Sequence, residues 1–247
     1  MSESGKVGMA NRAKRTVVPA TQDARSSFRE NLPTRVKLIL AAEALFGEYG
    51  IEAIPLRVVA KSAGQKNTSA VQYHFRNRFD LLHAIFEYRE AQLDPQRRAL
   101  LAHGRAEGRL EDIRWPLRIC FEPNFHLSES EGVNYIKLHA QYLSTHRPRG
   151  VLHPVDEKSR STENFRKGID LLHQHLPFLD LQQFMLRLES VGTMFLGAVI
   201  QNAARPPTKR IPGERFFLEI LEMMAAAISA KPPSEKRIAQ SDRKSRR

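Results

Sequence analysis

Apolar residues recur at helical spacing along most of the chain between positions 34 and 230. In the first predicted helix they follow at i, i+3, i+4, i+7, i+8 and i+11, which is one face of an α-helix: Leu38, Ala41, Ala42, Leu45, Phe46 and Tyr49. Thr34 is the expected N-cap, and Gly50 is expected to end the helix. No segment of useful length alternates polar and apolar residues as a strand would. The sequence therefore predicts an all-α fold.

Two short helices and one long helix are predicted next. Pro55 begins a short helix that ends at Gly64, a second ends near Phe75, and a long helix runs from Arg78 to about Leu101 with a bend at Pro95. The later helices are expected at Leu110–Phe121, Gly132–Thr145, Val155–Leu176, Leu181–Ala204 and Gly213–Ala230. Breaks are expected at Pro123, Pro148–Gly150, Pro177 and Pro206–Pro207.

The net charge of +12 is unevenly distributed and suggests four segments. Residues 1–33 carry +3, residues 34–80 carry +3, residues 81–230 carry only +1 and residues 231–247 carry +5. A basic front end on a nearly neutral body is typical of a nucleic-acid-binding module attached to another domain. We expect a disordered basic arm at 1–30, a helix-turn-helix domain at 31–80, a helical domain at 81–230 and a disordered basic tail at 231–247.

The segment 66–75 (KNTSAVQYHF) has the pattern of a DNA-recognition helix. Val71 and Phe75, spaced i and i+4, would anchor it to the core. The side chains left for bases and phosphates are Lys66, Asn67, Thr68, Ser69 and Gln72, with Tyr73 and His74 for phosphates. The alternative is a solvated helix-turn-helix that binds protein, which the basic ends of the chain disfavour.

Residues 35–85 resemble the DNA-binding domain of the TetR family of repressors. The matching features are Leu38-Ile39-Leu40-Ala41-Ala42 with Leu45-Phe46 and Gly50, Val59-Ala60 with Ala63-Gly64, Tyr73-His74-Phe75, and Leu81-Leu82. The resemblance implies a homodimer that binds a palindromic operator, and a helical ligand-binding and dimerisation domain. The family usually places Thr or Ser where Ile54-Pro55 stand here, so Arg57 is the substitute phosphate contact. At the start of the long helix, Arg78 stands where the family usually has Lys, which keeps the positive charge. Thr34 is the remaining DNA-binding candidate.

Two sets of residues in the second domain are candidates for the ligand site and the dimer interface. Those expected to line a largely apolar pocket are Trp115, Phe121, Phe125, Tyr135, His139, Tyr142 and Met185; each could instead be ordinary core. By the resemblance, the last two long helices form the interface, through Phe184, Leu188, Gly192, Phe195, Leu196, Val199, Phe217, Ile220, Leu221 and Met224. Plain core is the alternative for these as well.

Other classes of function find little support in the sequence. There is no nucleotide-binding loop or nucleophile motif, so we expect neither an enzyme nor a cofactor. The lone Cys120 and the histidine spacings do not predict a metal site. The absence of a long apolar run or signal segment predicts a cytoplasmic protein without a membrane partner. The leading hypothesis is a repressor released from its operator by a small, largely apolar effector. The alternative is a DNA-architectural or adaptor protein without an effector.

Overall fold

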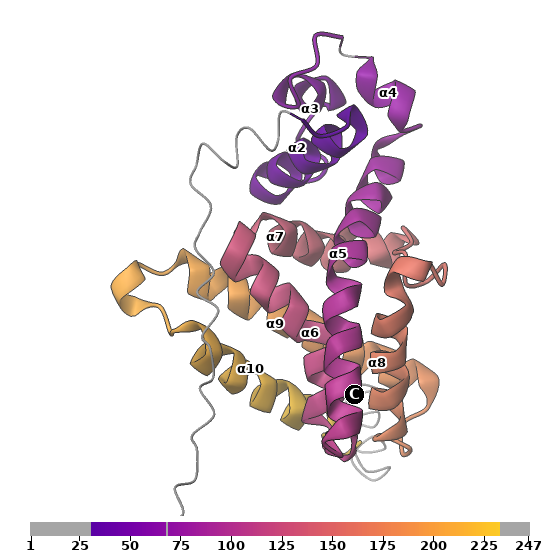
Figure 1. The fold of residues 1–247 in the computed structure, drawn as a ribbon, viewed down its shortest axis with the longest axis vertical. Helices are drawn as coiled ribbons and strands as arrows, with labels where there is room; N and C mark the ends of the chain where they lie inside the picture. Colours follow the sequence, from indigo (N-terminus) through magenta and orange to yellow (C-terminus); the bar gives the residue numbers. More distant parts are fainter. Residues whose placement is uncertain (1–30, 68, 233–247) are drawn as a thin grey trace, which may run out of the picture.

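The computed structural model describes residues 31–67 and 69–232, and every regular element among them is helical (Figure 1). The all-α prediction is confirmed. The predicted arm lies outside the described residues, as do Thr68 and the predicted tail beyond Pro232. The helices are α2 (Thr34–Tyr49), α3 (Leu56–Ser62), α4 (Ala70–His74), α5 (Arg78–Ala106), α6 (Arg114–Glu131), α7 (Asn134–Gln141), α8 (Glu163–Gln174), α9 (Leu181–Ala204) and α10 (Gly213–Ile228).

The long helix α5 connects the two parts of the molecule. Figure 1 shows α2, α3 and α4 gathered around one end of α5. Helices α6 and α8 pack along the rest of its length, and α9 and α10 pack on α6 and on each other. The Asn77 side chain caps the start of α5 by accepting a hydrogen bond from Asp80 N at 2.9 Å. A buried ion pair joins α5 to α2, since Arg89 Nε and Nη2 each donate to Glu43 at 2.6 Å. Most of the buried apolar residues of both parts form one continuous core, and a second, small cluster surrounds Trp115.

Three local expectations about helix ends are wrong. Pro33, not Thr34, occupies the N-cap of α2, and no side chain caps that end. The expected break at Pro123 is absent because Pro123 lies inside α6. Proline removes one hydrogen bond from the helix, but Phe121 and Phe125 on either side are buried, and this packing keeps the segment helical.

The helix expected from Val155 begins only at Glu163. Between these positions, side chains bind the backbone and compete with helical hydrogen bonds. Asp156 accepts from His153 N at 2.8 Å, and Ser159 Oγ accepts from Ser161 N at 3.3 Å. These contacts fix a turn-rich segment beside α5 and α8, and part of it lines the cavity described below.

Candidate nucleic-acid interface and ligand cavity

The helix-turn-helix forms one end of the molecule, which we call the tip (residues 56–67 and 69–76). In α4, Val71 is 1% exposed and Phe75 is 3% exposed, so the prediction that these two side chains anchor the helix is confirmed. On the opposite side Gln72 and Tyr73 are exposed, Tyr73 by 86%. The His74 ring lies edge-on to Tyr73, with the ring centroids 5.0 Å apart. The arrangement presents polar side chains outward from a fixed helix.

The turn before α4 is closed by its own polar side chain. Asn67 Oδ1 accepts a hydrogen bond from Ser69 N at 2.9 Å, an Asx-type contact that fixes the backbone at the start of a helix. Asn67 therefore shapes the turn, and its Oδ1 is engaged. Lys66 and Ser69 beside it are exposed, as the prediction of DNA contacts requires.

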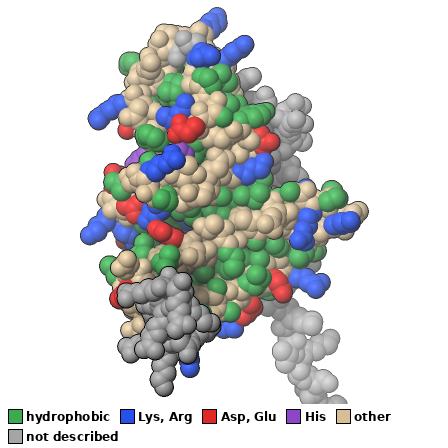
Figure 2. Space-filling model, turned by 180° about the vertical axis from the view of Figure 1, so that it is seen from behind, with side chains coloured by type: hydrophobic (Ala, Val, Ile, Leu, Met, Phe, Trp, Pro, Cys, Tyr) green, Lys and Arg blue, Asp and Glu red, His purple; other side chains and the backbone are tan. Residues whose placement is uncertain are grey.

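Positive charge gathers at the tip. The sequence has no Asp or Glu from Ala53 to Phe79. Arg57, Lys61, Lys66 and Arg76 are all exposed there, and Figure 2 shows Lys and Arg side chains at this end of the molecule. Sequence reasoning missed Lys61 and Arg76. The run without acidic residues was the signal that could have found them.

One of the predicted DNA-binding residues, Arg78, is bound to the backbone of its own chain. The Arg78 guanidinium donates to the carbonyl oxygens of Ile51 and Ile54, the latter at 2.7 Å. It also lies over the Phe46 ring, 5.5 Å from the centroid. Arg78 thus holds the connection between α2 and α3 onto α5, and its Nε lies 3.6 Å from the carboxylate of Glu52. Thr34 is half-buried in the first turn of α2.

A cavity of about 590 Å³ lies among α5, α6, α7, α8 and α9. This volume is within the range of small-molecule sites. Four of the seven residues predicted for the ligand pocket line it: Phe121, His139, Tyr142 and Met185.

The other three predicted pocket residues pack elsewhere. Trp115 belongs to a separate small cluster, where its Nε1 donates to Leu100 O at 3.1 Å. Phe125 stacks on Phe217 at a centroid distance of 5.3 Å, between α6 and α10. Tyr135 is buried outside the cavity lining, with its hydroxyl 3.4 Å from Glu90 Oε1. Helical periodicity places all three on inner faces, but it does not say which inner face borders a cavity.

The residues predicted for the dimer interface are a further correction. All ten are already buried by their own chain, with Phe195 only 1% and Met224 0% exposed. Within one chain these side chains face inward and leave little surface for a second subunit. Five of them form a wall of the cavity: Phe184, Leu188, Gly192, Phe195 and Leu196. The stripe is the inner face of α9, and the interpretation as plain core was the better one.

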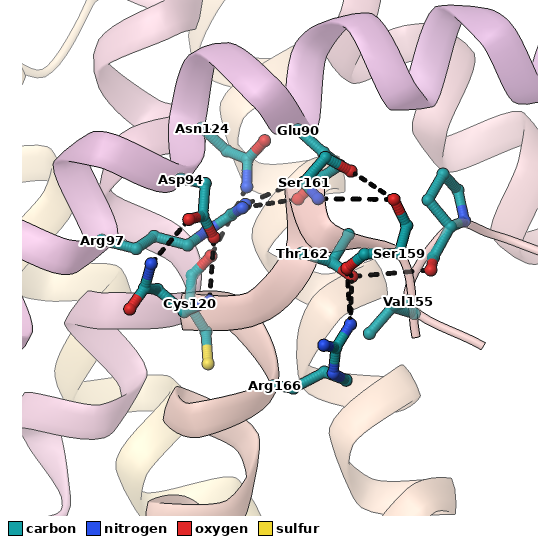
Figure 3. Close-up of polar contacts among 12 residues, drawn as sticks. Glu90, Asp94, Arg97, Cys120, Asn124, Val155, Ser159, Ser161, Thr162 and Arg166 are labelled. Carbon is teal, nitrogen blue, oxygen red and sulfur yellow. Dashed lines mark hydrogen bonds and ion pairs between the residues drawn. The ribbon is translucent and has the colours of Figure 1, made fainter. Parts of the chain in front are cut away.

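The floor of the cavity holds a buried ion pair and an amide. Arg97 Nη1 donates to Glu90 Oε2 at 2.5 Å, and both side chains are at most 1% exposed. Asn124 Nδ2 donates to Cys120 O at 3.4 Å, whereas no partner for its Oδ1 is found in the described part of the chain. Figure 3 shows these side chains within one polar cluster between α5 and the segments facing it. Burial raises the pKa of the Cys120 thiol to about 12, so it is neutral.

Two stacked histidines border the same cavity. The His139 and His153 rings lie 5.5 Å apart and nearly parallel, at 8°, with the Phe86 ring packed against both. Burial, and after it the neighbouring His153, lowers the pKa of His139 to about 3. Burial lowers the pKa of His153 to about 3 as well, although Asp156 opposes the shift. Both rings are therefore neutral at physiological pH. Of the described residues, no three His, Cys, Asp or Glu lie together as a metal site would require.

Helix α7 lies between this cavity and α2, the helix that packs against α3. On one side of α7, Gln141 Nε2 donates to Phe46 O at 3.2 Å and its Oε1 accepts from Ile51 N at 3.1 Å. A Cβ added at Gly47 would lie 2.3 Å from Asn134 O, so only glycine allows α2 to approach this closely. The other side of α7 carries His139 to the cavity. One short helix therefore contacts both the cavity and α2.

The outer face of α9 and α10 carries exposed apolar side chains among charged ones such as Glu189, Arg215 and Glu219. Leu186 is 66% exposed, Met223 50% and Leu218 44%. A Cβ at Gly197 would meet nothing within 4 Å. Figure 2 looks onto the back of the molecule and shows hydrophobic side chains gathered across its middle. Within the described ranges, α9 alone is long and apolar enough to cross a membrane by length and composition, a test that core helices also pass.

Comparisons with known proteins agree with this architecture. No protein-family model matches the chain, and no curated protein matches it. Among solved structures the chain is similar to a TetR family transcription regulator from Marinobacter aquaeolei VT8, with a TM-score of 0.52 and 14% identity over 82% of this chain and 97% of that chain. The chain has the fold of a TetR family transcription regulator, and the fold that the sequence resemblance implied is confirmed.

Proposed function

We propose that this protein is a DNA-binding transcription regulator, a repressor that binds a palindromic operator as a homodimer and is released by a small ligand. The observation that carries the proposal is the tip. It combines a helix anchored by Val71 and Phe75, outward polar side chains on that helix, and a run from Ala53 to Phe79 without a single acidic residue. Contacts from the exposed Lys and Arg side chains of the tip to DNA phosphates would supply affinity. Contacts from α4 to the bases would supply sequence preference.

The test is selection of DNA sites from a pool of random duplexes by the full chain. The expected result is an enriched inverted repeat whose half-sites are about one helical turn apart. Gln72→Ala should relax the base preference, whereas Lys66→Ala should weaken all duplexes evenly. The matched control Gln182→Ala, on an exposed position of α9, should change neither. Binding without any enriched sequence would support the alternative, an architectural protein, and would overturn the proposal.

The homodimer is proposed to form through the outer face of α9 and α10, defined by Leu186, Ser190, Thr193, Gly197, Leu218 and Met223. The inner face of each helix is already buried in its own subunit, so the outer face is the part of this pair that a partner can cover. Large apolar side chains there would lose contact with water on association, and the open space at Gly197 permits a close approach of helices.

Sedimentation of charged variants at micromolar concentration tests the interface. Leu186→Glu combined with Met223→Glu should give folded monomers, because both positions are exposed within one chain. Leu152→Glu, a control at an exposed leucine outside α9 and α10, should stay dimeric. Phe195→Asp should unfold the subunit instead, because it buries a charge in the cavity wall. A dimeric double variant would place the interface elsewhere.

Ligand and DNA are proposed to be linked through α7. A ligand that contacts His139 and Tyr142 touches the helix whose Gln141 closes the end of α2. A shift of α7 would therefore move α2. Because α2 packs against α3, the tip of one subunit would then move relative to the tip of its partner subunit in the dimer. Ligand binding and DNA binding then favour different positions of α7, which makes the linkage between them negative.

A further inference from the structure

A second hollow, of about 410 Å³, lies between α5 and α8 and is separate from the apolar cavity. Its lining is mostly charged, and cations outnumber carboxylates by four to two. We call it the basic groove and define it by these charged residues: Asp94, Arg98 and Arg105 of α5, and Arg160, Glu163 and Lys167 at the start of α8 or in the turn before it. Leu101 and Asn164 are the buried residues of its lining.

Both carboxylates of the basic groove are engaged by groups other than its arginines. Asp94 Oδ1 accepts a hydrogen bond from Asn164 N at 2.9 Å, and its Oδ2 accepts one from Asn164 Nδ2 at 2.6 Å. Glu163 Oε1 accepts from Lys167 Nζ at 2.6 Å. The hydrogen bond from Lys167, together with the nearby positive charges, lowers the pKa of Glu163. The first carboxylate therefore joins α5 to α8, and the second pairs with the lysine.

Three arginines of the basic groove are left without a counter-ion. Arg98, Arg105 and Arg160 are all exposed, and none of their guanidinium groups forms an ion pair within the described part of the chain. Like charges that line one hollow repel one another, and a bound anion would relieve this repulsion. A guanidinium presents parallel N–H donors that match two oxygens of a phosphate, so arginines suit this anion better than a simple halide.

The basic groove is remote from the tip. Figure 1 shows α8 beside the part of α5 that lies away from α2, α3 and α4. At 1.5 Å per residue, Arg98 lies about 30 Å along α5 from Arg78, and Arg105 lies farther still. The groove is therefore distinct from the surface proposed for DNA, and its volume is that of a small-molecule site.

We propose that the basic groove binds a small polyanion of the phosphate class, held by Arg98 and Arg105 from α5 and by Arg160 from the turn before α8. Such a ligand would join α5 to α8, whose Phe165 and Ile169 also line the apolar cavity. The proposal is independent of the effector and operator proposed above, because binding to the groove can be measured without either.

The experiment is calorimetric titration of the full chain with inorganic pyrophosphate at constant ionic strength. We expect saturable binding of one pyrophosphate per chain. Arg98→Gln/Arg160→Gln should weaken it about tenfold or more, because charged hydrogen bonds are lost. Arg205→Gln/Lys209→Gln removes the same charge from exposed positions between α9 and α10 and should bind as the wild type does. Equal weakening in both variants, or binding that does not saturate, would overturn the proposal.

Two further comparisons identify the place and the kind of ligand. Lys61→Gln/Arg76→Gln, at the tip, should leave pyrophosphate affinity unchanged, and a loss confined to this variant would place the anion on the tip and contradict the proposal. Arg105→Gln should weaken pyrophosphate by itself, which gives an independent measurement in the groove. The affinity of a scrambled DNA duplex should be the same for Arg105→Gln and the wild type. If duplex and pyrophosphate affinity fall equally, the groove binds nucleic acid, and the small-ligand proposal is wrong.

Discussion

The tip and the cavity use polar side chains in opposite ways. At the tip, Gln72, Lys66 and Arg57 are exposed, and buried apolar residues only fix the helix that carries them. In the cavity, Glu90, Arg97 and the two histidines are buried, and each must be neutral or paired. The first arrangement suits a charged, hydrated surface such as DNA. The second suits a small molecule that replaces water completely. Because burying charged and polar groups costs free energy unless they are paired, the stability of this region is sensitive to substitution.

The largest expected effect comes from the ion pair in the cavity floor. Arg97→Met leaves the Glu90 carboxylate buried without a counter-ion, so the free energy of unfolding should fall by about 3–5 kcal/mol. Urea denaturation measures the loss. The double variant Glu90→Leu/Arg97→Met removes both charges and should recover most of it. Equal losses in the single and double variants would show that packing, and not the unpaired charge, sets the cost.

The stacked histidines predict a dependence of stability on pH. In the folded chain both rings stay neutral down to about pH 3, whereas in the unfolded chain they take up protons below about pH 6.5. Acid therefore favours the unfolded state. Lowering the pH from 7 to 5 should reduce the free energy of unfolding by about 2 kcal/mol for each ring. Urea denaturation at the two pH values is the measurement.

Substitution separates these rings from the other titrating groups. His139→Phe should remove about half of the fall between pH 7 and 5, while Gln182→Leu, at an exposed position of α9, should leave it unchanged. The assignment is wrong if His139→Phe and the wild-type chain lose stability in parallel.

A smaller effect is expected at the contact between the two regions. Gln141→Leu removes the side chain that binds both Phe46 O and Ile51 N, and should cost about 1–2 kcal/mol of stability. Amide hydrogen exchange should speed up at the end of α2, and the influence of a ligand bound in the cavity on DNA affinity should shrink. Gln182→Leu is the exposed control. If a ligand bound in the cavity changes the DNA affinity of a folded Gln141→Leu protein as much as that of the wild type, α7 does not couple ligand binding to DNA binding.

The smallest effect distinguishes Arg57 from Arg78, two arginines that the sequence analysis had both assigned to DNA binding. Arg57→Ala should leave stability within about 0.5 kcal/mol and lower the slope of log affinity against log salt by about 1, the value of one phosphate contact. Arg78→Ala should instead lower stability, because its guanidinium binds two backbone carbonyls. Titration of DNA at several salt concentrations, beside denaturation, checks both. A changed salt slope in Arg78→Ala alone would reverse these roles.

The helix-turn-helix was predictable because its signals are local. Val71 and Phe75 are four residues apart, Gly50 and Gly64 both adopt positive φ at the ends of short segments, and the absence of acidic residues is a property of a single run. Helical periodicity likewise identified α9 and α10 and placed Phe195 and Met224 on their apolar faces, which we assigned to the dimer interface although their own chain buries them.

Only the tertiary structure decided what each buried face meets. A period of 3.6 residues shows that Phe195 faces inward, but core, cavity and partner subunit give the same pattern, and the packing of α5 to α9 makes it a cavity wall. Arg78 looked like a phosphate ligand because its charge is visible in the sequence, whereas its acceptors, Ile51 O and Ile54 O, are more than twenty residues away. For the same reason, the sequence does not predict the stacked histidines or the unpartnered Asn124 Oδ1. Burial and hydrogen-bond satisfaction depend on which segments meet in space, and local spacing along the chain does not specify this.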